Sequence, residues 1–538
     1  MKKQVAKWMA LLTVASSLSA FTACGGGKGD GETLNVYCLE KGYGTAWLEA
    51  TLELFEEQDW VKEKYNNVKT KLSGNSEDGF AREKIEGGKS YNEFDLLFGV
   101  NLRDQEEKNF LEDMTESVYY AEVPDEPGVK VIDKMPQRVQ SAMINYYKPA
   151  RTDGKNNYTS LNYIDGVMGL LYNHDLLVEE LGLQVPVTTN EFIAVAESIQ
   201  STGYDSHAGN DLDTVIMNYA SHNYWDSAYT VWWTQYEGME QYENFFDGYD
   251  PIEDKTDQMS VLDQPGRKKA LETFATVLSN YSYEDSAQNI AEPILIQNRY
   301  LRGEGIFHYN GDYFFDETIM AGGTDRGYDI RFMKLPVISS IVETLENKSM
   351  TDATLAAVIR EIDADKTWDV SQAKADGVSK ADYEKIAAAR CVCISASVLP
   401  QVAVIPNYAD NKDIAADFLR FLYTDKAIRE FTIASGGACL PTTYDYTSDT
   451  EVMNSLNNVS KSKFEVLQGT SNYKVSYFVS AAHTRLGGAG LQAIRFNGLE
   501  FNFCRDASYR ISVDDILKDE KSHYQGSWAQ LIAAARQN

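Results

Sequence analysis

The sequence predicts an α/β protein with at least two domains, and both its length and its order of elements support that prediction. The chain has 538 residues, 43% of them hydrophobic and 12% aromatic, so it can bury more than one core. Segments with the alternation of strands, at 34–39, 68–72 and 94–98, are separated by segments with helical spacing. Strands that alternate with helices imply a parallel sheet covered on both faces.

The first predicted helix follows the first predicted strand. Its apolar positions recur at helical spacing and are Trp47, Leu48, Leu52 and Phe55. A charged helix over 78–86 is expected to precede the third strand. Because ligands approach the carboxyl ends of parallel strands, the loops 40–45 and 99–104 are the expected ligand-binding edge.

A second region begins near Tyr158, and its clearest signal is the start of a helix. Thr188 and Glu191 have the spacing of a capping box, ahead of an apolar helical stripe that begins at Phe192. This pattern predicts a helix that begins directly after Thr188.

The later part of the chain alternates between helical and strand-like segments. Residues 340–390 are charged and rich in alanine, which predicts helices inserted between two strands. Strand character returns over 391–404. The strongest helical stripe covers 411–431, and Gly436 and Gly437 follow it as a stop signal.

The first residues have the pattern of a secretory signal, assigned to 1–23. Lys2, Lys3 and Lys7 accompany a short apolar run over 8–14 that fades into small residues. The run is too short to cross a bilayer core of about 30 Å. An extracytoplasmic protein is therefore expected.

Residues 21–24, Phe-Thr-Ala-Cys, resemble a bacterial lipobox. The resemblance implies that Cys24 is acylated and anchors the protein to the outer face of the cell membrane. The glycine-rich segment 24–32 would then be a flexible tether. An ordinary signal with a cysteine at its junction is the alternative.

The charge balance disfavours nucleic acid as a partner. The chain has 50 Lys and Arg against 80 Asp and Glu, a formal net charge of −30, and such a field repels a phosphate backbone. The same charge disfavours a basic patch as the membrane anchor, so anchoring is expected to depend on lipid.

The cysteines indicate neither a disulfide framework nor a metal site. Six are present, and Cys24 leaves an odd number in the folded part. Cys38, Cys391 and Cys393 lie in strand-like runs, where a free cysteine behaves as a small core residue. No second cysteine or histidine pair stands at zinc spacing. No metal and no cofactor are expected.

Motifs of hydrolytic enzymes are missing, although one enzyme class stays open. The six histidines are scattered without a His-Glu-x-x-His pair, and there is no Gly-x-Ser-x-Gly elbow. Residues 88–90 end like a phosphate loop, but Glu83 stands where its first glycine is required. A glycosidase needs only two carboxylates, and 80 acidic residues leave that possibility open.

Four segments, taken in order, resemble the family 1 extracellular solute-binding proteins of ABC importers, the group that contains maltose-binding protein. The first is Leu-Tyr-Asn-His-Asp-Leu-Leu with the capping box after it. The second is the glycine-rich run that ends in Asn-Gly-Asp-Tyr. The four segments cover 171–192, 302–313, 329–336 and 415–437. Their order and spacing over most of the chain carry the resemblance.

The resemblance implies an α/β, two-lobed periplasmic-binding-protein-like fold of class II, with discontinuous lobes joined by hinge crossings. Crossings are expected near residues 150, 393 and 440. The expected first lobe is 33–150 plus 394–440, and the expected second lobe is 151–393 plus 441–538, with 340–390 as a helical insertion. Hinged lobes can close on a ligand.

The implied function is transport. The protein would not be an enzyme but would capture a mono- or oligosaccharide by lobe closure and deliver it to an ABC permease with a separate ATPase. A monomer is expected. The alternatives are a secreted glycan-acting hydrolase and a protein that binds a peptide or another solute.

Sugar recognition needs flat aromatic faces and side chains that hydrogen-bond hydroxyl groups. Two adjacent tryptophans cannot both point inward on a helix, so Trp232 or Trp233 is expected to be available to the cleft, although their stripe is also typical of a core. The candidate ligand-binding residues are Glu40, Lys41, Tyr43, Asn101, Arg103, Asp104, Asn223, Trp232, Trp233, Asn310, Asp312 and Tyr313.

Overall fold

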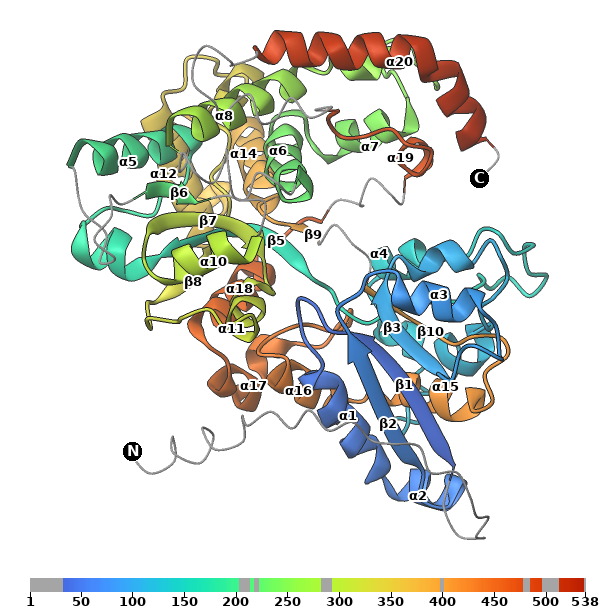
Figure 1. Ribbon diagram of the computed structural model, residues 1–538. Coiled ribbons are helices and arrows are strands. Elements are labelled where there is room, and N and C mark those ends of the chain that lie inside the picture. The colour runs from blue at the N-terminus through green and yellow to red at the C-terminus, as the bar shows by residue number, and fades with distance from the viewer. Residues whose placement is uncertain are drawn as a thin grey trace, which may run out of the picture.

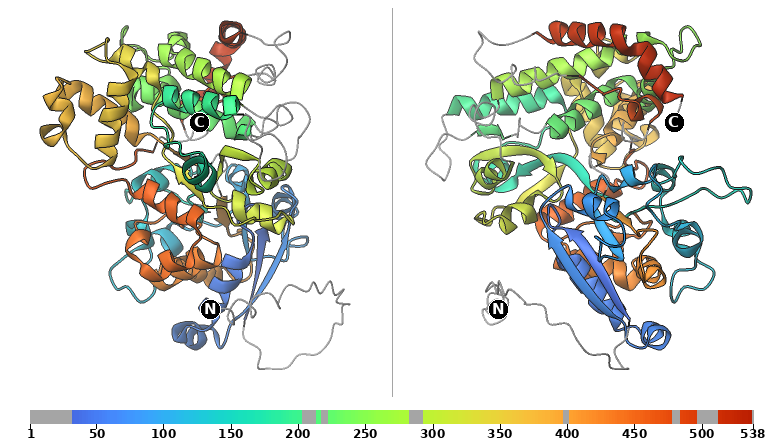
Figure 2. Two further views of the ribbon diagram at one scale, coloured as in Figure 1. Left: turned by 90° about the vertical axis from the view of Figure 1, so that its left-hand side faces the viewer. Right: turned by 45° about the vertical axis from the view of Figure 1, so that its right-hand side comes forward.

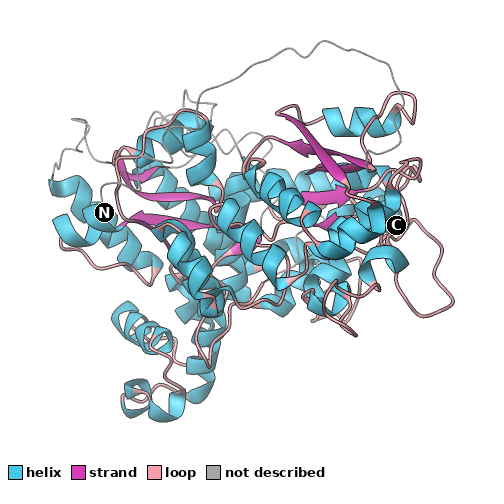
Figure 3. Cartoon of the chain, turned by 90° about the horizontal axis from the view of Figure 1, so that it is seen from below, coloured by secondary structure: helices cyan, strands magenta, loops and turns pink. Residues whose placement is uncertain are grey.

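The chain folds into two lobes, each built around its own sheet (Figure 1). The structure is a computed structural model, and it describes residues 32–202, 213–216, 222–281, 293–396, 401–477, 484–495 and 512–536. Seen from below, the strands form two separate groups (Figure 3). We call the lobe that begins the described chain lobe 1 and the other lobe 2.

The sheet of lobe 1 has the order β2-β1-β3-β10-β4. Strand β1 lies between β2 and β3 and is parallel to both, with Val36 opposite both Leu72 and Leu96. Strand β10 is antiparallel to both β3 and β4. The strands are β1 (Thr33–Leu39), β2 (Lys69–Asn75), β3 (Leu96–Val100), β4 (Leu161–Asn162) and β10 (Gln401–Val404).

Helices cover the sheet of lobe 1, and aromatic side chains fill the space between. Trp47 is fully buried, and its ring contacts those of Phe98, Tyr163 and Phe431. The longer elements are α1 (Ala46–Glu56), α2 (Asp59–Tyr65), α3 (Phe80–Glu86), α4 (Gln137–Ala142), α15 (Lys412–Phe421), α16 (Asp425–Ala434) and α17 (Thr450–Ser455). The short turns are η2 (Leu102–Gln105), η3 (Thr115–Tyr119), η4 (Val131–Lys134) and η9 (Tyr446–Ser448).

The sheet of lobe 2 has the order β6-β7-β5-β8, with β9 also paired to β5. Every residue of β5 is buried, and β5 runs antiparallel to β7 and β8, whereas β6 is parallel to β7. The strands are β5 (Val167–Asn173), β6 (Asp213–Ile216), β7 (Gly305–Gly311), β8 (Ile330–Met333) and β9 (Ser395–Ala396).

Helices form most of lobe 2. Among them is the predicted insertion, whose helices protrude from the side of the lobe (Figure 2). The insertion contains η7 (Ser339–Thr344), α12 (Asp352–Asp363), η8 (Trp368–Val370), α13 (Gln372–Ala375) and α14 (Lys380–Cys391). The other helices are η5 (Asp175–Glu180), α5 (Thr189–Thr202), α6 (His222–Glu237), α7 (Met239–Asp247), η6 (Met259–Asp263), α8 (Pro265–Tyr281), α10 (Pro293–Leu301), α11 (Phe314–Met320), α18 (Asn458–Gln468), α19 (Arg485–Gly488) and α20 (Val513–Ala535).

The capping box predicted at the start of α5 is present in a modified form. The backbone N–H of Glu191 donates to Thr188 Oγ1 at 3.1 Å. The Glu191 carboxylate reaches back one residue further than expected and accepts from the N–H of Val187 at 2.9 Å. The first bond satisfies a donor that the first helical turn leaves unpaired, and the second ties the residue before the cap to the helix, so together they fix where α5 begins.

The chain passes between the lobes later than expected at two places. Strand β4 still belongs to the first sheet and Val167 begins the second, so the first crossing follows Asn162 and not residue 150. Helix α17 packs in the lobe 1 core through Val452. Helix α18 touches both lobes, with Phe464 in the lobe 1 core and Val466 in a lobe 2 cluster. The third crossing is therefore α18 and not the segment near residue 440.

Two predicted elements have different bounds. The helix expected over 411–431 is two helices, because Thr424 caps a new one by accepting from the N–H of Ala427. Cys391 ends α14, so the strand expected to begin there is limited to β9 and β10 within the described residues. Cys38 and Cys393 are buried as predicted.

Candidate functional site

The loop after β1 brings lobe 1 into contact with lobe 2. Tyr43 Oη donates a 2.7 Å hydrogen bond to Asp312 Oδ1, at the end of β7. The Tyr43 and Tyr313 rings meet edge to face, with their centroids 5.6 Å apart. Tyr43 is 8% exposed. Three predicted site residues from the two lobes are therefore together.

Two glycines allow the loop to approach so closely. Gly42 and Gly44 have φ values of +61° and +64°, a backbone conformation that favours glycine. A Cβ atom at position 44 would lie 2.9 Å from Met320 Sδ in α11. The backbone N–H of Gly42 donates to the carboxylate of Glu317, also in α11. The loop is thus held against α11 as well as β7.

A buried ion pair continues the network behind Tyr43. Lys463 Nζ lies 2.9 Å from Asp312 Oδ2, and the two side chains are 1% and 2% exposed. Lys463 also donates to the carbonyl oxygen of Gly437, which follows α16. The pair therefore joins the end of β7, the crossing helix α18 and the segment after α16. Sequence reasoning missed Lys463, because no local pattern distinguishes it from a surface lysine.

Burial and charge shift the pKa values of these groups. Burial first, and the Asp312 carboxylate second, hold the pKa of Tyr43 well above its ordinary 10.0. Burial acts to lower the pKa of Lys463, but the Asp312 carboxylate and the Cys439 thiol outweigh it, so that pKa is raised. The lysine therefore stays charged opposite the aspartate.

Asp316 lies beside this network with a raised pKa. Burial raises the pKa of Asp316 to about 6, Asp312 adds to the rise, and Lys463 opposes it. A Cβ atom at Gly436 would lie 2.5 Å from Asp316 Oδ2, and Gly436 has a φ of +68°. The glycine therefore admits the carboxylate to the space between α11 and the end of α16.

A second polar group links the crossing segments. Arg138, in α4, donates to the carboxylate of Asp165, which lies between β4 and β5. The Arg138 guanidinium carbon is 4.5 Å from the centre of the Tyr477 ring, beyond α18. The N–H of Asp165 donates to the carbonyl oxygen of Cys439 at 2.8 Å. These contacts tie the first crossing to α4 and to the chain segments on either side of the α17–α18 region.

The predicted residues after β3 divide into one inward and two outward side chains. Arg103 pairs with Glu106 and donates to the carbonyl oxygens of Ala142 and Ile144, so it holds the segment after α4 and does not face solvent as a ligand contact would. Asn101 and Asp104 are exposed and make no hydrogen bond through their side chains within the part of the chain that the structure describes.

Comparison with known proteins identifies the fold. No family model and no curated protein sequence matches the chain. Among solved structures, maltose-bound MalE3 of T. maritima is similar over 92% of this chain and 99% of its own, with a TM-score of 0.55 and 13% identity. Apo RafE of Streptococcus pneumoniae is similar over 93% of this chain and 98% of its own, with a TM-score of 0.54 and 12% identity. A chitin oligosaccharide binding protein is similar over 93% of this chain and 99% of its own, with a TM-score of 0.53 and 14% identity.

The chain has a two-lobed periplasmic-binding-protein-like fold. The fold expected from the sequence is therefore confirmed, since these neighbours match nearly the whole chain. The strand order, in which the antiparallel β10 returns from the other lobe and pairs beside β3, agrees with discontinuous lobes joined by crossings.

Glu40 and Lys41 lie at the exposed edge of the loop after β1, which also carries Tyr43. Lys41 pairs with Asp78 at 2.9 Å, and the two side chains are 46% and 63% exposed. The Glu40 side chain passes over β2, where a Cβ atom at Gly74 would lie 2.6 Å from Glu40 Oε1. Both side chains stay accessible beside the buried Tyr43.

The two tryptophans are not available to a ligand, contrary to the expectation. Trp232 and Trp233 are 4% and 0% exposed. Their indole N–H groups donate to Pro336 O at 3.0 Å and Gln264 Oε1 at 2.9 Å. The expectation was wrong because α6 is packed on several sides, by α7, α8 and α14 as well as β7, so it has no single buried face. The side chain of Asn223 and the acylation candidate Cys24 lie outside the described residues.

Asn310 also differs from the expectation. It is fully buried in β7, where its amide nitrogen lies 2.8 Å from His308 Nε2 and its Oδ1 accepts from the N–H of Gly311. Its hydrogen bonds shape the end of the strand that carries Asp312 and Tyr313. Asn310 thus stabilises the end of β7 that contacts lobe 1, and its side chain has no exposed surface for a ligand.

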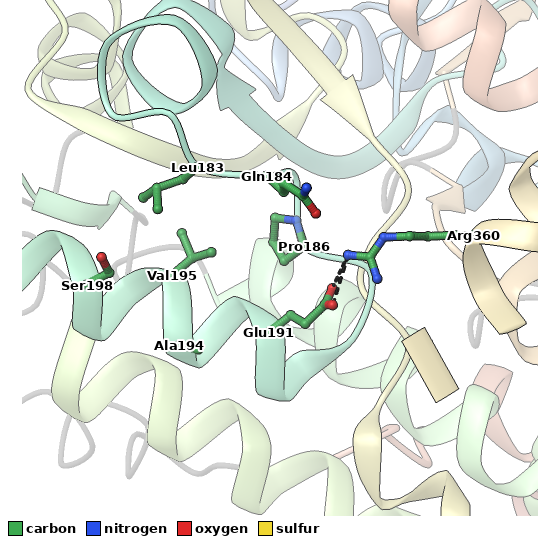
Figure 4. Close-up of a pocket in the computed structure, with 8 residues that line it drawn as sticks. All are labelled: Leu183, Gln184, Pro186, Glu191, Ala194, Val195, Ser198 and Arg360. Atoms are coloured by element: carbon green, nitrogen blue, oxygen red, sulfur yellow. Dashed lines mark hydrogen bonds and ion pairs between the residues drawn. The ribbon is translucent and has the colours of Figure 1, made fainter. Parts of the chain in front are cut away.

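A pocket of about 270 Å³ lies elsewhere in lobe 2, lined by residues of α5 and of the segment before it together with Arg360 (Figure 4). Arg360 donates to both carboxylate oxygens of Glu191 at its edge, at 2.8 and 2.9 Å. Glu191 already caps α5, and none of the residues at the contact between the lobes lines the pocket. Within the described ranges, no cluster of three or more His, Cys, Asp or Glu could hold a metal ion. No helix there combines the length and apolar character of a membrane span.

Proposed function

We propose that the protein is an extracytoplasmic solute-binding protein that captures a carbohydrate between its lobes and delivers it to an ABC permease. The observation that carries the proposal is the contact of Tyr43 with Asp312 and Tyr313 across the two lobes. The fold supports the proposal as well, because similar solved structures are described as bound to maltose, raffinose or tagatose, or as binding chitin oligosaccharide. In this proposal the protein changes no bond in its ligand and is not an enzyme.

Lobe closure supplies the binding energy in this proposal. A ligand shifts an open protein toward the closed form by as much as its contacts differ between the two forms. The loop after β1 and the end of β7 belong to different lobes, so closure assembles them. Tyr313, which is partly exposed, offers an aromatic face to a sugar ring, and the exposed Asn101 and Asp104 offer partners to its hydroxyl groups.

The proposed anchoring and partners follow from the sequence. Cys24 would carry the lipid, and the glycine-rich residues after it would be the tether. The permease and its ATPase would be separate proteins, and the binding protein would act as a monomer. Replacement of Cys24 by serine should release the protein from the membrane fraction into the medium.

A ligand screen tests the proposal directly. The chain from residue 25 onward is heated with single sugars, including maltose, raffinose, tagatose and chitobiose. A sugar at about 100 times its dissociation constant stabilises the folded state by about 2.7 kcal/mol. A positive sugar is then checked by calorimetry, by small-angle scattering for a decrease in the radius of gyration, and by chromatography for products. Stabilisation by no sugar, or release of a cleaved product, contradicts the proposal.

A further inference from the structure

Two adjacent tyrosines project from lobe 1 just after α4. Tyr146 and Tyr147 are 72% and 57% exposed. Most aromatic rings of this lobe lie in its core, and an adjacent pair in solvent gives up the burial energy that such rings usually provide. The pair therefore needs an explanation other than folding.

The backbone that carries the two rings is firmly held. Asn145, which is 1% exposed, donates from its amide to Thr159 Oγ1 at 2.8 Å and accepts from the N–H of Tyr147 at 2.9 Å. Its own N–H donates to the carbonyl oxygen of Asn157 at 2.8 Å. The exposure of the rings is thus built into an anchored turn and is not the result of a loose loop.

Arg103 places this turn at the ligand-binding edge of the sheet. Its guanidinium group, in the turn after β3, donates to the carbonyl oxygens of Ala142 and Ile144, just before the tyrosines. The exposed Asn101 and Asp104 flank Arg103 on the same turn. Figure 1 shows α4 on the side of lobe 1 that is turned toward lobe 2, and to the right of α11.

We propose that Tyr146 and Tyr147 form an outer subsite that stacks against one ring of an oligosaccharide, with Asn101 and Asp104 as partners for its hydroxyl groups. Arg103 acts as a positioning residue for this subsite. The inference rests on the proposed function and adds that the ligand extends beyond the junction at Tyr43. Tyrosine suits the role because a flat, amphipathic ring loses little conformational entropy on binding.

Tyr91 provides a matched control on the same lobe. It is 60% exposed, but it precedes β3 and so lies toward the opposite, amino end of that strand. The Lys84 ammonium group lies 5.0 Å from the centre of its ring. Its exposure matches that of Tyr146 and Tyr147, whereas its position is away from the ligand-binding edge.

The test compares long and short ligands by calorimetry, with maltopentaose against maltose and chitopentaose against chitobiose. Tyr146→Ala/Tyr147→Ala is expected to weaken binding of a pentasaccharide by about tenfold or more and to leave the disaccharide within about twofold, tenfold being the effect of 1.4 kcal/mol. Tyr146→Phe/Tyr147→Phe keeps the rings and should retain the affinity. Tyr91→Ala should change neither ligand. All of these side chains are exposed, so the thermal midpoint without sugar should stay the same.

Arg103→Lys tests the positioning role. Lysine keeps the charge but cannot donate to both carbonyl oxygens and to Glu106 in the fork geometry of arginine. We expect a selective loss for the pentasaccharide. An equal loss for both ligand lengths would indicate a general structural effect and overturn the role.

A second readout uses the rings themselves. Maltopentaose or chitopentaose should protect Tyr146 and Tyr147, but not Tyr91, from nitration by tetranitromethane. Three results would overturn the subsite and leave the proposed function standing. The alanine variant could bind the pentasaccharide with unchanged affinity, or the two rings could stay unprotected. The unmodified protein could also bind small sugars but neither pentasaccharide. Binding of no sugar by the unmodified protein would overturn both.

Discussion

The hydroxyl of Tyr43 donates to the carboxylate of Asp312 across the two lobes at 2.7 Å. The two residues are far apart in the sequence and lie on loops that belong to different sheets. Asp312 is held independently of Tyr43, because Lys463 and the N–H of Val167 also donate to it. Opening of the lobes would thus break one of the hydrogen bonds to Asp312 and leave the aspartate paired, as a reversible contact requires.

Tyr43→Phe should weaken sugar binding. The substitution removes a hydrogen bond to a charged group, which contributes about 1.5 to 3 kcal/mol when formed, and the bond exists only while the lobes touch. The expected result is an affinity for the screened sugar that is lower by about tenfold, where 1.4 kcal/mol corresponds to tenfold. Titration calorimetry measures it, and scattering should show a larger mean radius of gyration.

Tyr65→Phe is the matched control for this prediction. Tyr65 Oη donates to Asp417 Oδ2 at 2.6 Å, but both residues lie within lobe 1. Its loss should lower the unfolding midpoint without changing the sugar affinity. Equal affinities of the Tyr43→Phe variant and the unmodified protein would show that the junction does not respond to ligand.

Lys463→Met should destabilise the protein strongly. It leaves the Asp312 carboxylate buried without its cation, and loss of one partner from a buried pair costs about 3 to 5 kcal/mol. Denaturation in urea should show the lower midpoint. The double variant Lys463→Met/Asp312→Asn leaves no uncompensated charge, so it should recover part of the loss. Failure of the double variant to recover any stability would argue against the ion pair as the cause.

Asp316→Asn should change how stability depends on pH. The carboxyl group has a pKa of 3.8 in the unfolded chain and about 6 in the folded protein, so the folded state binds the proton more tightly. The free energy of unfolding of the natural protein therefore falls as pH rises from 4 to 6, by about 1 to 3 kcal/mol from this group. The asparagine variant lacks this fall.

Thermal unfolding at pH 4 and pH 7.5 measures the difference between the Asp316→Asn variant and the unmodified protein. The variant should be the more stable of the two at pH 7.5, where the natural carboxylate is charged and Lys463 offsets only part of the cost of burying that charge. The advantage should disappear near pH 4. A difference of the same size at both pH values would contradict the raised pKa.

Local patterns in the sequence predicted many of the elements, and the resemblance of four segments to a known family predicted the two-lobed fold. The local patterns succeeded where the residues that decide the structure are close together in the sequence. The capping pattern at Thr188 and the stripe that begins at Trp47 involve neighbours a few residues apart, and both are present. The break at Thr424 was missed because the apolar stripe continues across it, although threonine followed by an acidic residue is itself a start signal for a helix.

The candidate site was only partly predictable, because its partners are distant in the sequence. Tyr43 was predicted from its loop, and Asp312 and Tyr313 from the resemblance of their segment to the solute-binding family; the structure brings the three together. The cation that completes the network, Lys463, is 151 residues from Asp312, and no periodicity reports such a pairing. The orientation of Trp232 depends likewise on how many elements surround α6, which only the packed structure reveals.

Glu520→Ala should loosen the terminal helix α20 from lobe 2. Glu520 and Arg267 form an ion pair at 2.9 Å, and both side chains are 1% exposed. Arg267 also donates to the carbonyl oxygens of Leu262 and Ala493, so it joins α8 to two further segments. Removal of the carboxylate leaves the guanidinium charge buried, and we expect a loss of about 3 to 5 kcal/mol.

An exposed pair between the same two helices supplies the control for Glu520→Ala. Lys268 and Asp514 are 2.6 Å apart, with their side chains 44% and 73% exposed. Asp514→Ala should therefore cost less than about 1 kcal/mol. Urea denaturation of both variants, followed by limited proteolysis of α20, distinguishes the two pairs. Because burial is what differs between them, similar midpoints for both variants would show that desolvation does not determine how α20 is held.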